Sequence, residues 1–292
     1  MLSIIISSYQ TQYYDQLIKN ISETIGHSFQ YEIIPIWNPN LMSITQAYNL
    51  GAQRAQYDYF LFLHEDVIFY TKDWGEKLVQ HLSVSDTGVI GIAGSNYVPK
   101  APSGWFIGDN NNTFIYIMGT PTSTSKKVRL KNSCPNYRNS AYGIDGVFMA
   151  VTRNVFLEFY FNEDLQGFHS YDIDFSLKVA GRYNNYVIND ILIEHFSFGK
   201  PDIKWLENNI EVRKNIKTSF PQKNNSAIEK ALYISFIETY FKYHFINLKE
   251  IKNVLEFYPL WRLRFKDQII VLKKIIQYLY YRKQLNLNRH SS

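Results

Sequence analysis

Short apolar runs alternate with segments of helical periodicity from the first residues of the chain, and this alternation limits the folds that it can adopt. Residues 2–6, 31–37 and 57–63 are apolar runs rich in β-branched or aromatic side chains, and helical spacing fills residues 13–25 and 43–55 between them. Runs without polar alternation are typical of strands buried on both faces of a parallel sheet. Parallel neighbours need crossover helices. The sequence therefore predicts βαβ units and an α/β fold.

The pattern continues to about residue 195 with one interruption. Residues 99–141 are rich in Pro, Gly, Asn, Ser and Thr and show little periodicity apart from 113–118, so we expect a long, partly ordered insertion that recognises substrate. Further strands are predicted at 88–95, 146–151 and 186–193, and further helices at 73–82, 153–160 and 172–181.

Beyond Pro221 the pattern becomes helical, which predicts two parts: an α/β domain over residues 1–222 and a basic helical region over residues 223–292. Ser226-Ala227-Ile228-Glu229 has the spacing of a capping box and predicts the start of a helix. With 292 residues, 46% hydrophobic and 20% charged, the chain is long and apolar enough to bury a sizeable core.

The charge of the chain is divided unequally along its length. Residues 1–200 contain 14 Lys and Arg against 18 Asp and Glu, and residues 201–292 contain 17 against 8, so the net charges are −4 and +9 and account for the total of +5. An acidic body fits a metal-using catalytic domain better than an enzyme with a basic cleft for nucleic acid. We therefore expect no nucleic-acid partner and a tail that meets an anionic surface.

The tail carries an amphipathic stretch after Pro259. Its apolar positions share one helical face and basic residues lie beside them: Phe265, Ile269, Leu272, Ile276 and Leu279, with Arg262, Arg264, Lys266, Lys273, Lys274, Arg282 and Lys283. Such a helix either packs on its own domain or docks peripherally on an anionic membrane. The sequence leaves both alternatives open.

A single cysteine, Cys134, excludes an internal disulfide framework and a cysteine-rich metal site, so the chemistry must rest on oxygen and nitrogen groups. The first apolar run is too short for a signal-peptide core and has no basic residue before it. No stretch approaches the roughly 18 uncharged apolar residues of a spanning helix. We expect a cytoplasmic protein, at the inner face of the cell membrane if the tail docks there.

Three polar clusters fall next to predicted strands and helices. His64-Glu65-Asp66 ends the third apolar run, where open α/β sheets bind ligands, and its carboxylates suit Mg²⁺ or Mn²⁺. Asp172 and Asp174 begin a predicted helix; one carboxylate can face the cleft as a general base. His195 follows the last predicted strand. Taken singly, the clusters also fit a solvated strand end, a pair of acids at a helix start and a structural histidine.

The order of these segments resembles that of the inverting family 2 glycosyltransferases of bacterial type, which have the GT-A fold. Residues 3–9 are similar to the family's nucleotide-binding strand, 47–52 to its Ala-Asn-x-Gly helix, 60–66 to the strand before its Asp-x-Asp metal motif, 143–150 to its donor-sugar strand and 171–177 to its Glu-Asp-x-Asp-Leu segment. The resemblance implies a Rossmann-like mixed sheet, mostly parallel and flanked by helices, with a C-terminal helical extension.

The same resemblance implies transfer, with inversion, of a sugar from a nucleotide-sugar donor, expected to be a UDP-sugar, to a glycan or lipid-linked glycan acceptor in bacterial surface polysaccharide or glycoconjugate assembly. It implies Mn²⁺ or Mg²⁺ on the diphosphate, held by Asp66 and His195, with Asp172 as the base and Asp174 as a structural residue. The residues expected at the donor are Ser7, Ser8, Tyr9, Asn38, Asn49, Glu65, Asp145 and Gly146.

Two positions depart from the family pattern. His64 replaces the first Asp of the metal motif. The acidic residue that the family usually has after the second strand is missing near Trp37-Asn38, so the contact with the nucleobase is open and donors with uracil, guanine or thymine all remain possible. A His-x-Asp pair can still bind Mn²⁺. The alternatives are a catalytically silent nucleotide- or glycan-binding module of the same fold and, less favoured, a nucleotidyltransferase, for which a glycine-rich phosphate loop after the first strand is missing.

Overall fold

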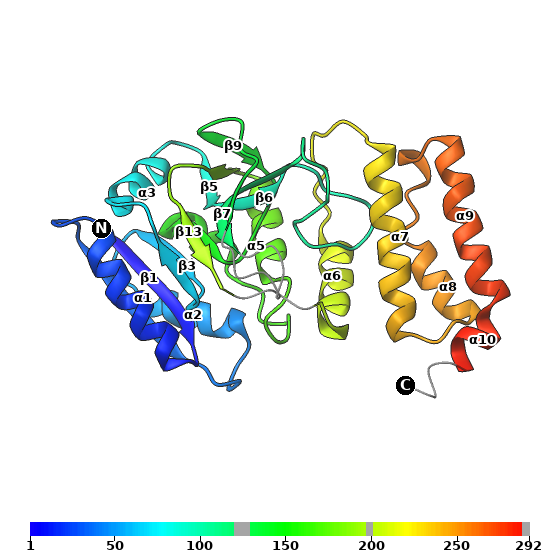
Figure 1. Cartoon of the computed structure of the whole chain (residues 1–292), viewed down its shortest axis with the longest axis horizontal. Coiled ribbons are helices and arrows are strands. Elements are labelled where there is room, and N and C mark those ends of the chain that lie inside the picture. The colour runs from blue at the N-terminus through cyan, green and yellow to red at the C-terminus, as the bar shows by residue number, and fades with distance from the viewer. Residues whose placement is uncertain (120–128, 197–200, 288–292) are drawn as a thin grey trace.

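The first five elements of the computed structural model, which describes residues 1–119, 129–196 and 201–287, follow the predicted alternation (Figure 1). They are β1 (Leu2–Ser8), α1 (Thr11–Thr24), β2 (Tyr31–Trp37), α2 (Ile44–Arg54) and β3 (Tyr59–Leu63). Ser43 caps α2 through a capping box with Gln46.

The rest of the α/β part contains β4 (Val67–Phe69), α3 (Trp74–Leu82), β5 (Thr87–Gly91), β6 (Ala93–Ser95), β7 (Thr113–Gly119), β8 (Arg129–Asn132), β9 (Arg138–Ala141), β10 (Gly143–Ile144), β11 (Phe148–Thr152), α4 (Arg153–Phe159), α5 (Tyr171–Ala180), β12 (Asn184–Ile188) and β13 (Ile193–His195). α6 (Ile203–Asn215) follows β13, before residue 222. The helical part beyond residue 222 contains α7 (Ser226–Tyr243), α8 (Leu248–Leu255), a 3₁₀ turn (Leu260–Arg262), α9 (Phe265–Tyr280) and α10 (Arg282–Leu287).

The main sheet has seven strands in the order β2-β1-β3-β11-β5-β12-β9. β2, β1 and β3 are parallel, β5 and β12 are parallel to each other, and β11 and β9 run antiparallel to their neighbours. A second sheet of six strands follows the order β10-β6-β7-β13-β4, with β8 paired to β7. The main sheet is mixed, as predicted, with three parallel and three antiparallel strand pairings.

The apolar runs are buried on both faces because helices cover both sides of the main sheet. In β1, Ile5 packs into one cluster with α2, α4 and α5, whereas Ile4 and Ile6 pack into the opposite cluster with α1 and α3. β3 divides in the same way between Phe62 and Leu63. This arrangement explains why neither strand alternates apolar and polar residues.

Three predicted segments differ in detail from the structure. Residues 88–95 form two strands, β5 and β6, which belong to different sheets, and the predicted strand at 186–193 likewise divides between the end of β12 and the start of β13. The insertion at 99–141 is more ordered than expected, since β7, β8 and β9 lie in it. The short strands are hard to predict because their partners are distant in sequence.

The predicted capping box at the start of α7 is wrong. The cap is Asn225, whose side chain accepts hydrogen bonds from the first turn, while Ser226 donates to Asp267. Glu229 is completely buried and accepts hydrogen bonds from the hydroxyl of Tyr97 and from Arg262. The side chains of Ser226 and Glu229 thus bond residues far away in the sequence instead of capping the helix. Glu229 links the helical part to the loop after β6.

The helical part lies beside α6 and the loop after β6 (Figure 1). Ala101 of that loop and Leu206 of α6 share an apolar cluster with residues of α7, α8 and α9. The α/β part and the helical part therefore have a common core across the expected boundary at residue 222. Among the described helices, none combines the length and the apolarity needed to cross a membrane.

Candidate active site and metal centre

The site lies at the carboxyl ends of β1 and β3. β2 lies on one side of β1 and β3 on the other, so the strand order reverses at this point and leaves a crevice at the edge of the sheet. Ser7 and Ser8 end β1, and His64-Glu65-Asp66 follows β3 directly. The sheet topology thus places two of the predicted segments side by side.

Two histidines and a carboxylate meet at this edge. His64, Asp66 and His195 each present a ligand atom, and these atoms lie within 4.8 Å of one another. Nε2 of His195 is 3.3 Å from Oδ1 of Asp66, and Nδ1 of His64 is 4.0 Å from the same oxygen. The structure therefore brings together the predicted ligands Asp66 and His195, and adds His64, which replaces the first Asp of the family's metal motif.

Backbone pairing fixes the place of His195. β13 pairs antiparallel with β4, with His195 opposite Val67, the residue after Asp66. The amide of Phe196 also donates a hydrogen bond of 3.1 Å to the carbonyl oxygen of Asp66. Because these main-chain contacts hold the segments of His195 and Asp66 together, both side chains are in place before a cation binds.

The protonation of His64 suits a divalent cation. Burial, and secondly the nearby His195, lower the pKa of His64 to about 4, so its imidazole is neutral at physiological pH. Burial lowers the pKa of His195, but its hydrogen bond and attraction to Asp66 outweigh that effect and leave this pKa raised. Two imidazole nitrogens and one carboxylate oxygen fit a transition-metal ion, and favour Mn²⁺ over the harder Mg²⁺.

Asp172 lies in the first turn of α5, next to the cluster. Its Oδ2 accepts a hydrogen bond of 3.1 Å from the amide of Gly146. Burial, and secondly the charge of Asp145, raise the pKa of Asp172 to about 7. A carboxyl group with a pKa near neutrality can take up a proton in a reaction and release it again.

Gly146 allows the strand-to-helix contact that holds Asp172. A Cβ at this position would lie 2.1 Å from the hydroxyl oxygen of Tyr171 and 3.1 Å from the Cβ of Asp172. Ser170, just before α5, has a left-handed backbone with a φ of 65°, an uncommon conformation for a residue other than glycine. The two positions together bring Tyr171 and Asp172 against the loop before β11.

Three residues expected at the donor form hydrogen bonds that hold segments of the protein chain around the site. Glu65 accepts hydrogen bonds from the hydroxyl of Ser8 and from the amides of Tyr9 and Gln10, which hold the loop after β1. The side-chain oxygen of Asn38 accepts from two amides of its own loop. Asn49 bonds the main chain of Phe161.

Asp145 and Asp174 differ in their surroundings. Asp145 accepts a hydrogen bond from the amide of Val147 and lines the larger cavity, and burial raises its pKa. Asp174 is buried in α5 and forms a 2.6 Å ion pair with Lys178, one turn later in the helix. This ion pair supports the structural role expected for Asp174.

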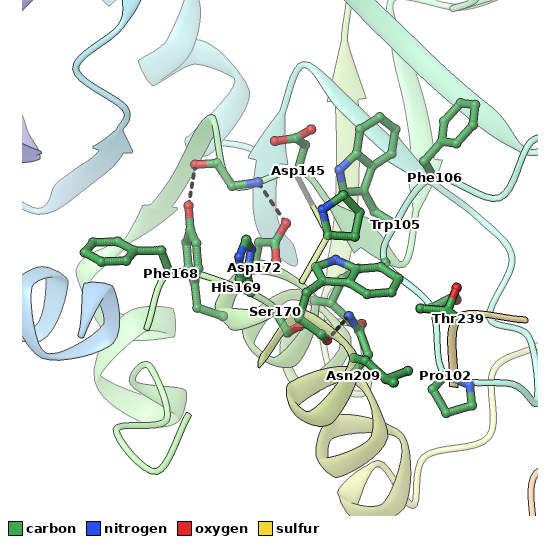
Figure 2. A pocket seen from close by; sticks show the side chains of 18 of the residues that line it. Pro102, Trp105, Phe106, Asp145, Phe168, His169, Ser170, Asp172, Asn209 and Thr239 are labelled. Carbon is green, nitrogen blue, oxygen red and sulfur yellow. Dashed lines mark hydrogen bonds between the residues drawn. The ribbon is translucent and has the colours of Figure 1, made fainter. Parts of the chain in front are cut away.

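Two cavities open on either side of the cluster. One, of about 490 Å³, is lined by Ser7, Tyr9, Gln10, Tyr13, Asn40, Ile44, His64, Glu65, Asp66 and Phe168. The other, of about 590 Å³, contains Asp145, Asp172 and His195 and extends to α6 and α7 (Figure 2). His64 and Phe168 line both cavities, so the cluster lies where the two cavities meet.

Tyr171 is the residue of the site that sequence reasoning missed. Its hydroxyl lies 2.8 Å from Nε2 of His64 and donates to the carbonyl oxygen of Gly146. Its place directly before Asp172 is the signal that could have indicated it. Burial raises its pKa well above the usual value, so it stays protonated.

The fold and the site define an α/β protein with a candidate metal centre at the carboxyl edge of its main sheet. The profile of a family described as "Glycosyltransferase like family" matches residues 3–229, so the chain belongs to this glycosyltransferase family, which is family 2-like. The predicted family resemblance is confirmed. No curated protein matches the chain by sequence.

Solved structures confirm the GT-A fold. The structure of GalNAc-T7 with UDP, GalNAc and Mn²⁺ gives a TM-score of 0.56 at 12% identity, over 88% of this chain and 54% of that protein, so this chain spans about half of it. TarS 1-349 of S. aureus gives 0.53 at 12% identity, over 98% and 88% of the two chains. Its complex with UDP-GlcNAc gives 0.51 at 12% identity, with the same coverage.

Proposed function

We propose that the protein transfers a sugar, with inversion and in the presence of Mn²⁺, from a UDP-sugar to a glycan or lipid-linked glycan acceptor of the bacterial surface. The observation that carries this proposal is the convergence of Asp172 and the His64-Asp66-His195 cluster where two cavities meet. A transferase needs this arrangement, because donor and acceptor must reach one reaction centre from different sides.

The smaller cavity is the proposed donor nucleotide site. It lies at the carboxyl end of β1, where Ser7 and Tyr9 line it. The rings of Tyr9 and Tyr13 also line it and can stack on a nucleobase. The GalNAc-T7 and TarS structures contain UDP or UDP-GlcNAc, which supports a uridine nucleotide here. Asn38 shapes the neighbouring loop after β2, because its side chain bonds the main chain of Leu41 and Met42.

The proposed chemistry is a single displacement at the anomeric carbon. Asp172 accepts the proton of the acceptor hydroxyl as its oxygen forms the new glycosidic bond, and the bond from the sugar to the diphosphate breaks. His64, Asp66 and His195 would hold the cation. When bound, the cation neutralises charge on the leaving diphosphate. Direct attack from the side of Asp172 inverts the anomeric centre.

The exposed face of α9 is the proposed contact with the inner face of an anionic membrane. Val271 and Ile275 bury one side of this helix in the helical part, whereas Phe265, Ile276 and Tyr280 are 79%, 61% and 78% exposed. α9 therefore packs on the helical part through the face of Val271 and Ile275. The apolar face predicted from the sequence, which includes Phe265 and Ile276, is mostly exposed to solvent.

Basic residues border this exposed face. Lys266 and Lys273 project next to it on the helix, Arg264 precedes it and Trp261, 91% exposed, lies one turn before. Exposed aromatic and apolar side chains with flanking lysines fit the headgroup layer of an anionic bilayer, where each basic residue contributes about 1 kcal/mol. This docking would place the site near a lipid-linked acceptor.

The central test is release of nucleoside diphosphate from a panel of UDP-, GDP- and dTDP-sugars with Mn²⁺, Mg²⁺ or EDTA. We expect Mn²⁺-dependent release from one UDP-sugar, and Asp66→Asn should abolish both this release and Mn²⁺ binding. Leu157→Ser, an exposed change on α4, is the matched control. Nucleotide binding without turnover, in the presence of acceptor glycans, would instead identify a silent binding module.

A further inference from the structure

The larger cavity is built by both parts of the chain. On one side it is lined by residues of the α/β part, among them Asp145 and Asp172, and on the other by residues of α6 and α7 (Figure 2). On α7 the lining residues are Leu232, Ser235, Phe236 and Thr239, which share one face of the helix at spacings of three and four. The helical part therefore forms a wall of the reaction site.

Aromatic rings form part of this cavity. Trp105, in the loop after β6, and Trp205, on α6, both line it, and the ring of Trp205 lies 3.7 Å from a Cβ built on Gly104. Neither ring is fully buried, so each presents a face or edge to the cavity. The apolar faces of sugar rings pack against aromatic side chains of this kind.

Several neutral polar atoms of the cavity wall are unpaired. Oγ of Ser103, Oγ of Ser170 and Oδ1 of Asn209 are buried and have no hydrogen-bond partner among the described residues. Nδ2 of Asn209 is already bonded to the carbonyl oxygen of Trp205 (Figure 2). Buried polar groups are normally paired, so atoms of this kind indicate a missing hydrogen-bonding ligand or water.

We propose that this cavity is the acceptor subsite and that it binds an uncharged sugar ring, with α7 as the wall that selects the acceptor. The inference rests on the proposed transferase function and extends it to the acceptor class. Trp105 and Trp205 contact the ring faces, while Ser235, Thr239 and Asn209 bond its hydroxyl groups. Asp172, in the same cavity, then accepts the proton of the reacting hydroxyl.

The charges on the wall favour a neutral acceptor over a phosphate-bearing polyol. The titratable groups that line the cavity are Asp145, Asp172 and the three histidines His64, His169 and His195. Among the described lining residues there is no Lys or Arg, the side chains that usually pair with a phosphate. The unpaired atoms are hydroxyl and amide oxygens, which match the hydroxyl groups of a sugar. Aromatic faces add contact area that an open-chain polyol cannot fill.

The test is saturation-transfer NMR on the full chain with methyl glycosides of hexoses and N-acetylhexosamines, and with glycerol 3-phosphate as the competing class. We expect at least one methyl glycoside to bind the wild type. Ser235→Trp fills the cavity from α7 and should weaken this binding by about tenfold or more. Ala227→Trp, an exposed change on the same helix outside the cavity, is the matched control and should bind like the wild type.

Thr239→Trp is a second cavity-filling variant, which keeps the test decisive if Ser235→Trp fails to fold. Unchanged glycoside binding in the folded variants, binding of glycerol 3-phosphate alone, or binding of no glycoside at all would overturn the proposal. Binding of Mn²⁺ and UDP is measured in parallel. A wild-type protein that binds neither would defeat the proposed function, whereas the glycoside titration reports on the acceptor cavity itself.

Discussion

The hydroxyl of Tyr171 lies 2.8 Å from Nε2 of His64 and donates its hydrogen to the carbonyl oxygen of Gly146. A hydroxyl has one hydrogen, so the contact with His64 requires Nε2 to carry a proton and donate it. In the neutral imidazole, Nδ1 then has the free lone pair, and this atom faces Asp66 at 4.0 Å. Tyr171 thereby sets the tautomer that a metal ligand needs.

Removal of this hydroxyl should weaken the metal site without removing a ligand. Tyr171→Phe is expected to lower Mn²⁺ affinity by roughly 10- to 100-fold, the usual cost of losing an outer hydrogen bond to a ligating histidine. Isothermal titration with Mn²⁺ measures the change. Tyr183→Phe, which loses a hydroxyl bonded to Glu158 far from the site, is the control. Equal affinities in the two variants would contradict the assigned tautomer.

Activity should depend on the protonation of Asp172. Burial and the charge of Asp145 raise the pKa of this carboxyl to about 7, and only the ionised form accepts a proton. We therefore expect kcat/KM of the free enzyme to rise with pH and to level off above about pH 7. The measurement is sugar transfer between pH 5 and 9 at saturating Mn²⁺. A rate independent of pH across this interval would exclude Asp172 as the base.

The same pKa predicts an effect on stability. A carboxyl whose folded pKa is raised holds its proton in the native state after the unfolded chain has lost it, so its stabilising contribution is lost as pH rises from about 4 to 7. Asp172→Asn cannot ionise. It should therefore abolish transfer but, at pH 8, stabilise the fold by on the order of 1 kcal/mol, after allowance for solvent screening of a partly exposed group.

Thermal unfolding at pH 5 and pH 8 checks this expectation. The difference in melting temperature between Asp172→Asn and the wild type should grow in favour of the variant at the higher pH. Asp174→Asn is the contrasting variant, because Asp174 is paired with Lys178 and its loss breaks a buried contact. Destabilisation of Asp172→Asn at pH 8 would show that the carboxylate contributes to the fold.

Membrane docking should depend on the exposed face of α9. The double variant Phe265→Ser, Ile276→Ser removes two exposed apolar side chains and should lower partition onto phosphatidylglycerol vesicles by roughly tenfold or more. Raised salt should also weaken binding, because the lysines act through long-range attraction. Co-sedimentation with vesicles measures both effects. Equal binding to phosphatidylcholine vesicles, or association of the protein with itself through this face, would contradict the assignment.

Local pattern in the sequence is sufficient for most of the fold. The strands of the βαβαβ segment and the Ser43 cap of α2 are visible in the chain because burial on both faces and capping leave local signatures. The division of residues 88–95 and 186–193 between strands of two different sheets is not visible, since it depends on partners far along the chain. The false capping box at Ser226 has the same origin: both side chains bond distant residues.

The sequence by itself determined the order of strands and helices, the acidic cluster at the end of β3 and the acids at the start of α5. Only the tertiary structure decided which of these residues meet. It brings His195 beside Asp66 through the pairing of β13 with β4, directs Glu65 to the loop after β1 and adds α7 to the cavity of Asp172. Hydrogen-bond partners are chosen by proximity in space, and a linear pattern does not contain the long-range pairing that creates that proximity.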